Sequence, residues 1–279
     1  MNFLLWTTFV EEKHSPLFQE LKDAGFDGVE IPIGAGDAAH YTRLKAELDR
    51  VGLECTTVLA VDSDHDPISP DPAVRDKARE KICDAIALNV VLGSGTMCGP
   101  FHSAYKQFSG SGPTEQEVQH SAEVMRVAGE VAQSAGVIMA LEPLNRFETY
   151  LLNTMAQARD YADLANHPNV KILYDTHHVH IEEKCPAAAI KTLGDTIGHV
   201  HVSENDRGTP GSGQVQWEKN FSTLHEVGYD GWLVFEAFSR IDQEFAGMIH
   251  IWRDFFDDPK DVYEKGLPFI REMWQKTAR

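Results

Sequence analysis

The sequence of 279 residues predicts one α/β domain, residues 1–279, folded as a (β/α)₈ barrel. Eight short apolar runs alternate with eight longer segments of helical spacing, and such alternation is typical of a parallel sheet. The runs are apolar almost throughout, as in strands that are buried on both faces. No linker or low-complexity tract divides the chain, and closure into a barrel suits eight such units at this length.

The predicted strands are the short apolar runs rich in β-branched and aromatic residues. In chain order they comprise residues 2–8, 28–33, 54–60, 90–93, 137–142, 170–175, 197–203 and 232–236. A doubly wound open sheet is the alternative architecture. The glycine motif of dinucleotide-binding sheets is missing after the first strand, however, and Gly93, Gly95 and Gly99 near the fourth strand have the wrong spacing for it.

The predicted helices are the amphipathic segments that follow the strands. They comprise residues 16–24, 39–51, 72–87, 115–135, 155–167, 186–193, 215–227 and 259–276. Capping residues mark several of their ends. Ser15-Pro16 and Asp71-Pro72 begin two of the helices, and Gly52 ends another.

Composition and charge exclude several classes of protein. Hydrophobic residues make up 42% of the chain, which is enough for a large core, so a disordered or fibrous protein is excluded. The chain has 25 Lys and Arg against 43 Asp and Glu, a formal net charge of −18, which is opposite to the charge that binds nucleic acid. We therefore expect no nucleic-acid partner and no endonuclease activity.

The sequence also indicates the cellular compartment. Residues 1–10 are apolar but lack the basic leader and the cleavage site of a signal peptide, and no apolar run is long enough to span a membrane. The four cysteines form no Cys-x-x-Cys motif, and we expect them to be reduced core thiols. These are Cys55, Cys83, Cys98 and Cys185. We expect a cytoplasmic protein with no membrane partner.

Four consecutive predicted strands carry a polar residue at or near their C-terminal end. Glu142 and Asp175 end the fifth and sixth strands, His201 lies near the end of the seventh, and Glu236 ends the eighth. Because the C-terminal ends of parallel barrel strands meet at one mouth, these side chains should converge. Three converging carboxylates with one imidazole predict a divalent cation, Mn²⁺, Mg²⁺ or Co²⁺. His199 shares the face of His201 and is expected to be a core or supporting group.

Segments around these residues resemble a known family. They are residues 141–154 (LEPLNRFETYLLNT), 174–178 (YDTHH), 198–207 (GHVHVSENDR), 235–236 (FE) and 251–254 (IWRD). Together they resemble the ketose 3-epimerases of the xylose isomerase-like TIM barrels, and the resemblance covers essentially the whole chain. The family implies a small-molecule sugar substrate and a homodimer or homotetramer.

The resemblance also implies roles for single residues. The implied metal ligands are Glu142, Asp175, His201 and Glu236, with Mn²⁺ favoured over Co²⁺ or Mg²⁺. Glu148, His178 and Arg207 would bind the sugar near its carbonyl group. Trp6, at the end of the first predicted strand, is expected to add an apolar wall to the substrate site.

The implied reaction is reversible epimerisation at C3 of a free ketose such as D-tagatose, D-fructose, D-psicose or L-ribulose. The ion would stabilise the cis-enediolate that forms when the C3 proton leaves, with Glu142 and Glu236 as base and acid on either side. Three alternatives stay open. One is aldose–ketose isomerisation of a small hydroxy-carbonyl compound such as hydroxypyruvate, and another is keto-inositol isomerisation or dehydration. The third is a non-catalytic sugar-binding barrel.

Overall fold

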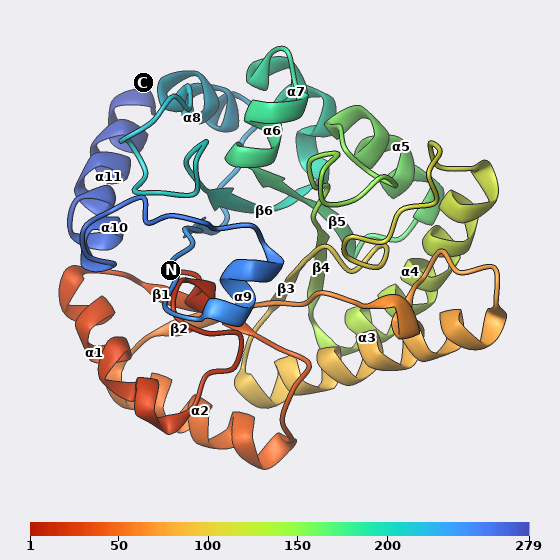
Figure 1. Cartoon of the computed structure of the whole chain (residues 1–279), viewed down its shortest axis with the longest axis horizontal. Coiled ribbons are helices and arrows are strands. Elements are labelled where there is room, and N and C mark those ends of the chain that lie inside the picture. The colour runs from red at the N-terminus through yellow and green to blue at the C-terminus, as the bar shows by residue number, and fades with distance from the viewer. Residues whose placement is uncertain (279) are drawn as a thin grey trace.

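The computed structural model describes residues 1–278 and shows a nearly closed barrel of parallel strands surrounded by helices (Figure 1). Its seven strands pair with one another in sequence order. They are β1 Gly28–Pro32, β2 Glu54–Val58, β3 Thr96–Gly99, β4 Ile138–Leu141, β5 Val170–Asp175, β6 Ile197–Val202 and β7 Leu233–Phe235. The predicted parallel α/β barrel is confirmed, with seven strands where the sequence predicted eight.

The first chain segment lies between the two edge strands, β1 and β7. Asn2 forms a parallel bridge with Glu30 of β1, and its backbone amide donates to the carbonyl oxygen of Phe235 in β7 at 2.9 Å. The predicted strand 2–8 is wrong beyond this bridge, because Phe3–Leu5 forms a 3₁₀ helix, η1. Oδ1 of Asn2 accepts a hydrogen bond of 2.9 Å from an amide of η1, and this cap turns the chain out of the extended conformation.

The predicted strand 90–93 is also wrong. These residues lie at the end of helix α3, Pro72–Leu92, and the strand of this unit is β3. Val90 continues the helix and points outward with 55% of its surface exposed, whereas Ile86 and Asn89 are fully buried. The packing of one helix face therefore outweighs the β propensity of the valine.

The other helices pack around the outside of the barrel (Figure 1). Those that confirm predicted segments are α1 Ser15–Ala24, α2 Ala38–Val51, α4 Glu115–Ala135, α5 Met155–Ala165, α7 Pro186–Leu193 and α8 Trp217–Glu226. The predicted last helix, 259–276, is divided into α10 Lys260–Glu264 and α11 Gly266–Thr277. A glycine at the start of α11 weakens helical continuity at this point.

Two short helices that the sequence did not predict follow the C-terminal ends of strands. These are α6 Thr176–Glu182, directly after β5, and α9 Gln243–Met248, which lies in front of the strands in the view of Figure 1. Asp175 caps α6, because its Oδ1 accepts hydrogen bonds from the amides of His177 and His178 at 2.5 and 3.3 Å. One predicted metal ligand therefore also begins a helix.

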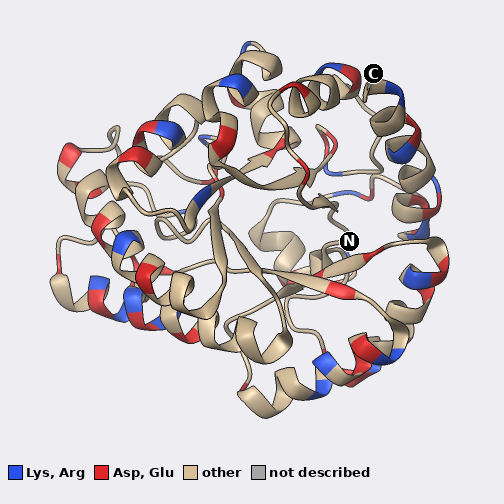
Figure 2. Cartoon of the chain, turned by 180° about the vertical axis from the view of Figure 1, so that it is seen from behind, with Lys and Arg blue, Asp and Glu red and all other residues tan. Residues whose placement is uncertain are grey.

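The core has a large part and two small ones, of which one consists of Phe238, Ala246 and Ile251. The larger part lies between the strands and the helices, and a smaller apolar cluster, Val58, Cys98, Ala140 and Leu173, is formed by β2 to β5. Charged residues lie mainly along the surrounding helices (Figure 2). The four cysteines are free. Within residues 1–278, no helix combines the length and the hydropathy that a membrane crossing needs.

Candidate functional site

Four adjacent strands bring the four predicted metal ligands together. Glu142 directly follows β4, Asp175 ends β5, His201 lies in β6 and Glu236 directly follows β7. Each side chain offers one ligand atom, and these atoms all lie within 4.8 Å of one another. All four residues are buried, with at most 3% of their surface exposed. The convergence predicted from the strand ends is present in the structure, and ion binding itself stays a prediction.

Two of the atoms that face one another in this cluster lack a hydrogen-bond partner among the described residues. Nδ1 of His201 lies 3.4 Å from Oε1 of Glu236 and 3.7 Å from Oε1 of Glu142 and Oδ2 of Asp175. Neither this Nδ1 nor Oε1 of Glu142 has a hydrogen-bond partner among the described residues, although both atoms are buried. Burying an unpaired polar atom is costly, and a divalent cation among these ligands would satisfy both atoms. The donor set of three carboxylates and one imidazole fits Mn²⁺, Co²⁺ or Mg²⁺.

Arg207 places a guanidinium group beside the carboxylates. Its Nη1 donates to Oδ2 of Asp175 at 3.0 Å, to Oγ of Ser203 at 2.8 Å and to Oε2 of Glu236. The side chain lies over the ring of Phe238, 4.8 Å from its centre, and the backbone has a φ of 66°. Burial would raise the pKa of Asp175, but Arg207 together with His178 and His201 outweighs this effect and holds the pKa well below its usual value.

His178 and Glu148 lie next to Arg207. Nδ1 of His178 accepts a hydrogen bond of 3.0 Å from the backbone amide of Asn145, and its Nε2 lies 2.9 Å from Nη2 of Arg207 and 3.4 Å from Oε1 of Glu142. Oε2 of Glu148 accepts from the side-chain amide of Asn145 at 3.1 Å. The structure thus places the three predicted sugar-binding residues beside the four predicted metal ligands, and their role stays a prediction.

These polar side chains line a cavity of about 120 Å³, together with Glu142 and Glu236. Its other walls are mostly apolar and include Leu4, Val58, Leu144, Phe238, Phe245 and Ile249. Trp6 is not among the residues that line this cavity. Its ring packs 5.1 Å from that of Phe3 and 6.3 Å from that of Tyr263, while Leu4 of the same segment faces the cavity. A contact of Trp6 with substrate stays a prediction.

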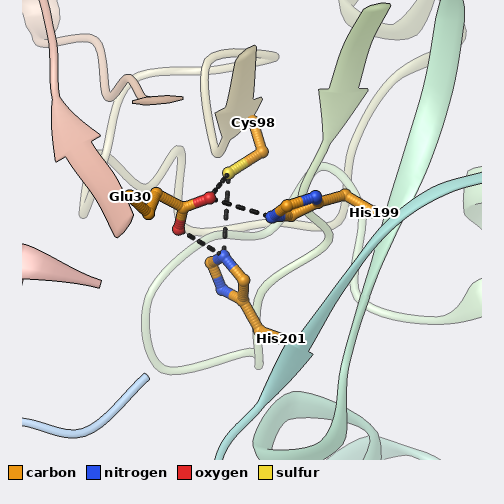
Figure 3. A group of neighbouring side chains, drawn as sticks. All are labelled: Glu30, Cys98, His199 and His201. Carbon is orange, nitrogen blue, oxygen red and sulfur yellow. Dashed lines mark hydrogen bonds and ion pairs between the residues drawn. The ribbon is translucent and has the colours of Figure 1, made fainter. Parts of the chain in front are cut away.

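The sequence analysis missed Glu30, which contacts a predicted ligand directly. Its carboxylate lies 2.7 Å from Nε2 of His201 and 2.8 Å from Nε2 of His199 (Figure 3). Burial would raise the pKa of Glu30, but the two imidazoles outweigh it and hold this pKa well below its usual value. A signal was available, because Glu30 is a charged residue between Val29 and Ile31 in an apolar strand.

The surroundings of Glu142 and Glu236 move their pKa values in opposite directions. Burial raises the pKa of Glu236, and Arg207 and His201 offset only part of this rise. Burial would also raise the pKa of Glu142, but His178 and His201 outweigh this effect and lower the pKa to about 2. Two carboxyl groups whose pKa values are pushed apart suit paired acid and base roles.

Comparison with known proteins shows which family of barrels this chain resembles. Residues 18–273 match the family model of the xylose isomerase-like TIM barrel. The ketose 3-epimerase of Arthrobacter globiformis is 33% identical over 272 residues, which cover 96% of this chain and 94% of that protein. The chain belongs to the ketose 3-epimerase family. It is therefore an enzyme of the isomerase class.

Two further relatives support the same membership. The L-ribulose 3-epimerase of Methylomonas sp. is 30% identical over 253 residues, 90% of this chain and 88% of that protein. The crystal structure of a D-allulose 3-epimerase from Methylomonas sp. in complex with D-allulose superposes on this chain with a TM-score of 0.91. The two sequences are 27% identical, and the match covers 98% of this chain and 95% of the Methylomonas chain. The resemblance found in the strand-end segments is confirmed, and this ketose 3-epimerase family member has the fold of its relatives throughout.

Proposed function

We propose that the chain catalyses reversible epimerisation at C3 of a free ketose with the help of a divalent cation, Mn²⁺ being favoured. One observation carries the proposal: four adjacent strands direct three carboxylates and an imidazole at one buried point. Two of the atoms there, Oε1 of Glu142 and Nδ1 of His201, have no hydrogen-bond partner among the described residues. The relatives act on ketoses, which makes D-tagatose, D-fructose, D-psicose and L-ribulose the candidate substrates.

The proposed ligands are Glu142, Asp175, His201 and Glu236. When bound, the cation would supply Lewis-acid stabilisation of the negative charge that develops on the sugar oxygens. A sugar that fills the cavity would displace water from between its mostly apolar walls, which would strengthen the electrostatic interactions inside it.

The proton transfers are assigned to Glu142 and Glu236. One carboxylate removes the proton from C3, and the electron pair of the C–H bond moves into the C2–C3 bond as the carbonyl oxygen gains negative charge. The other carboxyl group donates a proton to C3 from the opposite face, which inverts this carbon and restores the carbonyl group. The opposite pKa directions of the two glutamates support this division of roles.

The remaining polar residues of the cavity would hold the sugar in place. Glu148, His178 and Arg207 lie beside the two proposed proton-transfer groups, where they can bind the carbonyl oxygen and the first hydroxyl groups. Arg207 would also keep the carboxylates of Asp175 and Glu236 compensated before the cation binds. A cytoplasmic location and a homodimer or homotetramer stay predictions, and light scattering of the purified protein tests the oligomer.

A ketose panel in deuterated water tests the reaction. The protein is stripped with a chelator, reloaded with Mn²⁺, Co²⁺ or Mg²⁺, and incubated with each of the four ketoses. We expect activity to depend on the added ion and deuterium to enter at C3, as read by NMR. Deuterium at C1 or C2 would instead support an aldose–ketose isomerase, and metal-independent turnover would contradict the proposed cation.

Glu236→Gln tests the acid–base assignment. At saturating Mn²⁺, where the amide oxygen of glutamine can still act as a ligand, we expect turnover to fall by about 10²- to 10⁴-fold because the amide cannot exchange a proton. Elemental analysis checks that the metal is bound under these conditions. Glu130→Gln on α4 is the matched control, because its side chain is 65% exposed and remote from the cavity. Unchanged turnover of Glu236→Gln with unchanged metal content would show the assignment to be wrong.

A further inference from the structure

Beneath the proposed metal ligands lies a second buried cluster that the proposed reaction does not use. Figure 3 shows its four members, Glu30 from β1, Cys98 from β3, and His199 and His201 from β6. None of them has exposed surface. His201 belongs to both clusters, with Nδ1 toward the metal ligands and Nε2 toward Glu30.

Donors surround both carboxylate oxygens of Glu30. Oε1 lies 2.7 Å from Nε2 of His201 and accepts from the side-chain amide of Asn2 at 3.0 Å. Oε2 accepts from the hydroxyl of Thr56 at 2.8 Å and lies 2.8 Å from Nε2 of His199. The thiol of Cys98 also contacts Oε2, at 3.2 Å. The carboxylate is therefore held in one orientation by contacts from β2, β3, β6 and the first chain segment.

This arrangement decides which nitrogen of His201 is available to a cation. An ionised carboxylate can only accept hydrogen bonds, so the contact at 2.7 Å keeps a proton on Nε2. The nitrogen that can give its lone pair to an ion is then Nδ1. This is the atom that lies 3.4 to 3.7 Å from Glu142, Asp175 and Glu236.

The same four side chains could in principle be the ligands of an ion such as zinc, which binds thiolates. The distances between the side chains exclude this interpretation. Two nitrogen or oxygen ligands of one tetrahedral zinc ion lie about 3.3 Å apart, as its bond lengths require. Glu30 is only 2.7 Å from His201 and 2.8 Å from His199. These are hydrogen-bond distances, so the carboxylate holds the imidazoles directly.

We propose, on the basis of the metal site proposed above, that Glu30 is a positioning residue for His201. It fixes the ring orientation and keeps the proton on Nε2, so that Nδ1 is presented to the cation. His199 acts on the other oxygen of Glu30 and prevents the carboxylate from turning away. Glu30 touches neither the cation nor the sugar, and it acts only through the imidazole.

Binding of Mn²⁺ to the stripped full-length protein tests this role without any substrate. Free Mn²⁺ is followed by electron paramagnetic resonance during titration of wild type, Glu30→Gln, Glu30→Asp and Cys98→Ala. We expect Glu30→Gln and Glu30→Asp to bind Mn²⁺ about 10- to 100-fold more weakly, the usual effect of removing such a support. Cys98→Ala is the matched control, because its thiol contacts the same carboxylate at 3.2 Å and lies 3.6 Å from Nε2 of His201. A thiol is a weak donor and a weak acceptor, so its removal should leave the affinity close to that of wild type.

A second measurement tests the same role if the variants at Glu30 do not fold. It needs only the wild-type protein and His201→Gln. NMR of ¹⁵N-histidine protein loaded with Mg²⁺ reports which ring nitrogen carries the proton, and the His201→Gln spectrum assigns the signal. We expect His201 to be protonated at Nε2 and not at Nδ1.

The outcomes separate the two proposals. If wild type fails to bind Mn²⁺, the proposed metal site is wrong and the role of Glu30 fails with it. If wild type binds Mn²⁺ but folded Glu30→Gln and Glu30→Asp bind equally well, or if His201 carries its proton on Nδ1, only the positioning role is wrong. An equal loss of affinity in Cys98→Ala would also contradict it, because general disturbance of the cluster would then explain the effect.

Discussion

The side-chain amide of Asn2 donates a hydrogen bond of 3.1 Å to Oε1 of Glu236, which lies 234 positions away in the chain. The same amide donates to Glu30, and the backbone amide of Asn2 donates to Phe235. The residue that joins the edge strands of the barrel thus also contacts a proposed metal ligand. Closure of the barrel and construction of the site depend on the same few atoms.

Substitution of Asn2 should therefore reduce stability. We expect Asn2→Ala to lower the free energy of unfolding by about 1–3 kcal/mol, because buried acceptors lose their donor. Asn2→Asp should be worse, since it places a third carboxylate beside Glu30 and Glu236. Urea denaturation of the metal-free proteins measures the free energy of unfolding of both variants. Gln133→Ala is the control, because Gln133 on α4 is exposed. Equal stability of Asn2→Asp and wild type would contradict the contact.

Arg207→Gln should make the protein depend more strongly on its cation. Without the guanidinium, Asp175 and Glu236 lose a buried positive partner, and loss of such a partner costs about 3–5 kcal/mol. Added Mn²⁺ should restore part of this loss by compensating the same carboxylates. The rise in Tm on adding Mn²⁺ to chelated protein should therefore be larger for Arg207→Gln than for wild type.

A surface arginine provides the control for this experiment. Arg159 on α5 pairs with Asp163 near the surface, and Arg159→Gln should leave the Mn²⁺-induced rise in Tm unchanged. If Arg207→Gln and wild type show the same rise, the guanidinium does not compensate the metal ligands.

Tyr174→Phe should destabilise the barrel without altering the site. The hydroxyl of Tyr174 donates to Oδ1 of Asn220 on α8, and both residues are buried. The substitution leaves that oxygen without its donor, which we expect to cost about 1–3 kcal/mol in the free energy of unfolding. Chemical denaturation measures the loss, and the double variant Tyr174→Phe/Asn220→Leu should lose less than the two single losses combined.

Gly99→Ala should be strongly destabilising. Gly99 ends β3 with a φ of 121°, and a Cβ there would lie 2.3 Å from the backbone oxygen of Leu59. Strained backbone and overpacking each cost about 1–3 kcal/mol, so we expect a loss above 2 kcal/mol or failure to fold. Gly112→Ala is the matched control, because its Cβ would meet nothing within 4 Å. Thermal melts that rank the two variants equally would contradict the close approach at Gly99.

Much of the site was predictable because parallel strands share one direction. Any polar residue that ends an apolar strand must then lie at the same mouth as the others, which is how Glu142, Asp175 and Glu236 could be grouped without coordinates. Glu30 escaped this reasoning because it lies in the middle of β1 and not at its end. Its role depends on the distance to His201 across the barrel, which no local pattern contains.

The errors in the strands have different causes. At residues 90–93 the β propensity of the valines is real, but the helix continues because its other face is buried. At residues 2–8 a single capping side chain, that of Asn2, turns an apolar run into η1. The first outcome is decided by packing that forms only once the barrel has assembled. The second depends on a local hydrogen bond between Asn2 and the amide of Leu4, which competes with the extended conformation.

By itself the sequence determined the alternation of strands and helices, because this follows from periodicity. It also determined the four residues of the proposed metal site, because parallel strands share one direction, and the membership of the family, because local motifs carry it. Only the tertiary structure decided how the barrel is joined at Asn2, which nitrogen of His201 faces the carboxylates, and that Leu4 and not Trp6 lines the cavity. Those features depend on orientations and distances between segments far apart in the chain, and such relationships arise only when the segments pack together.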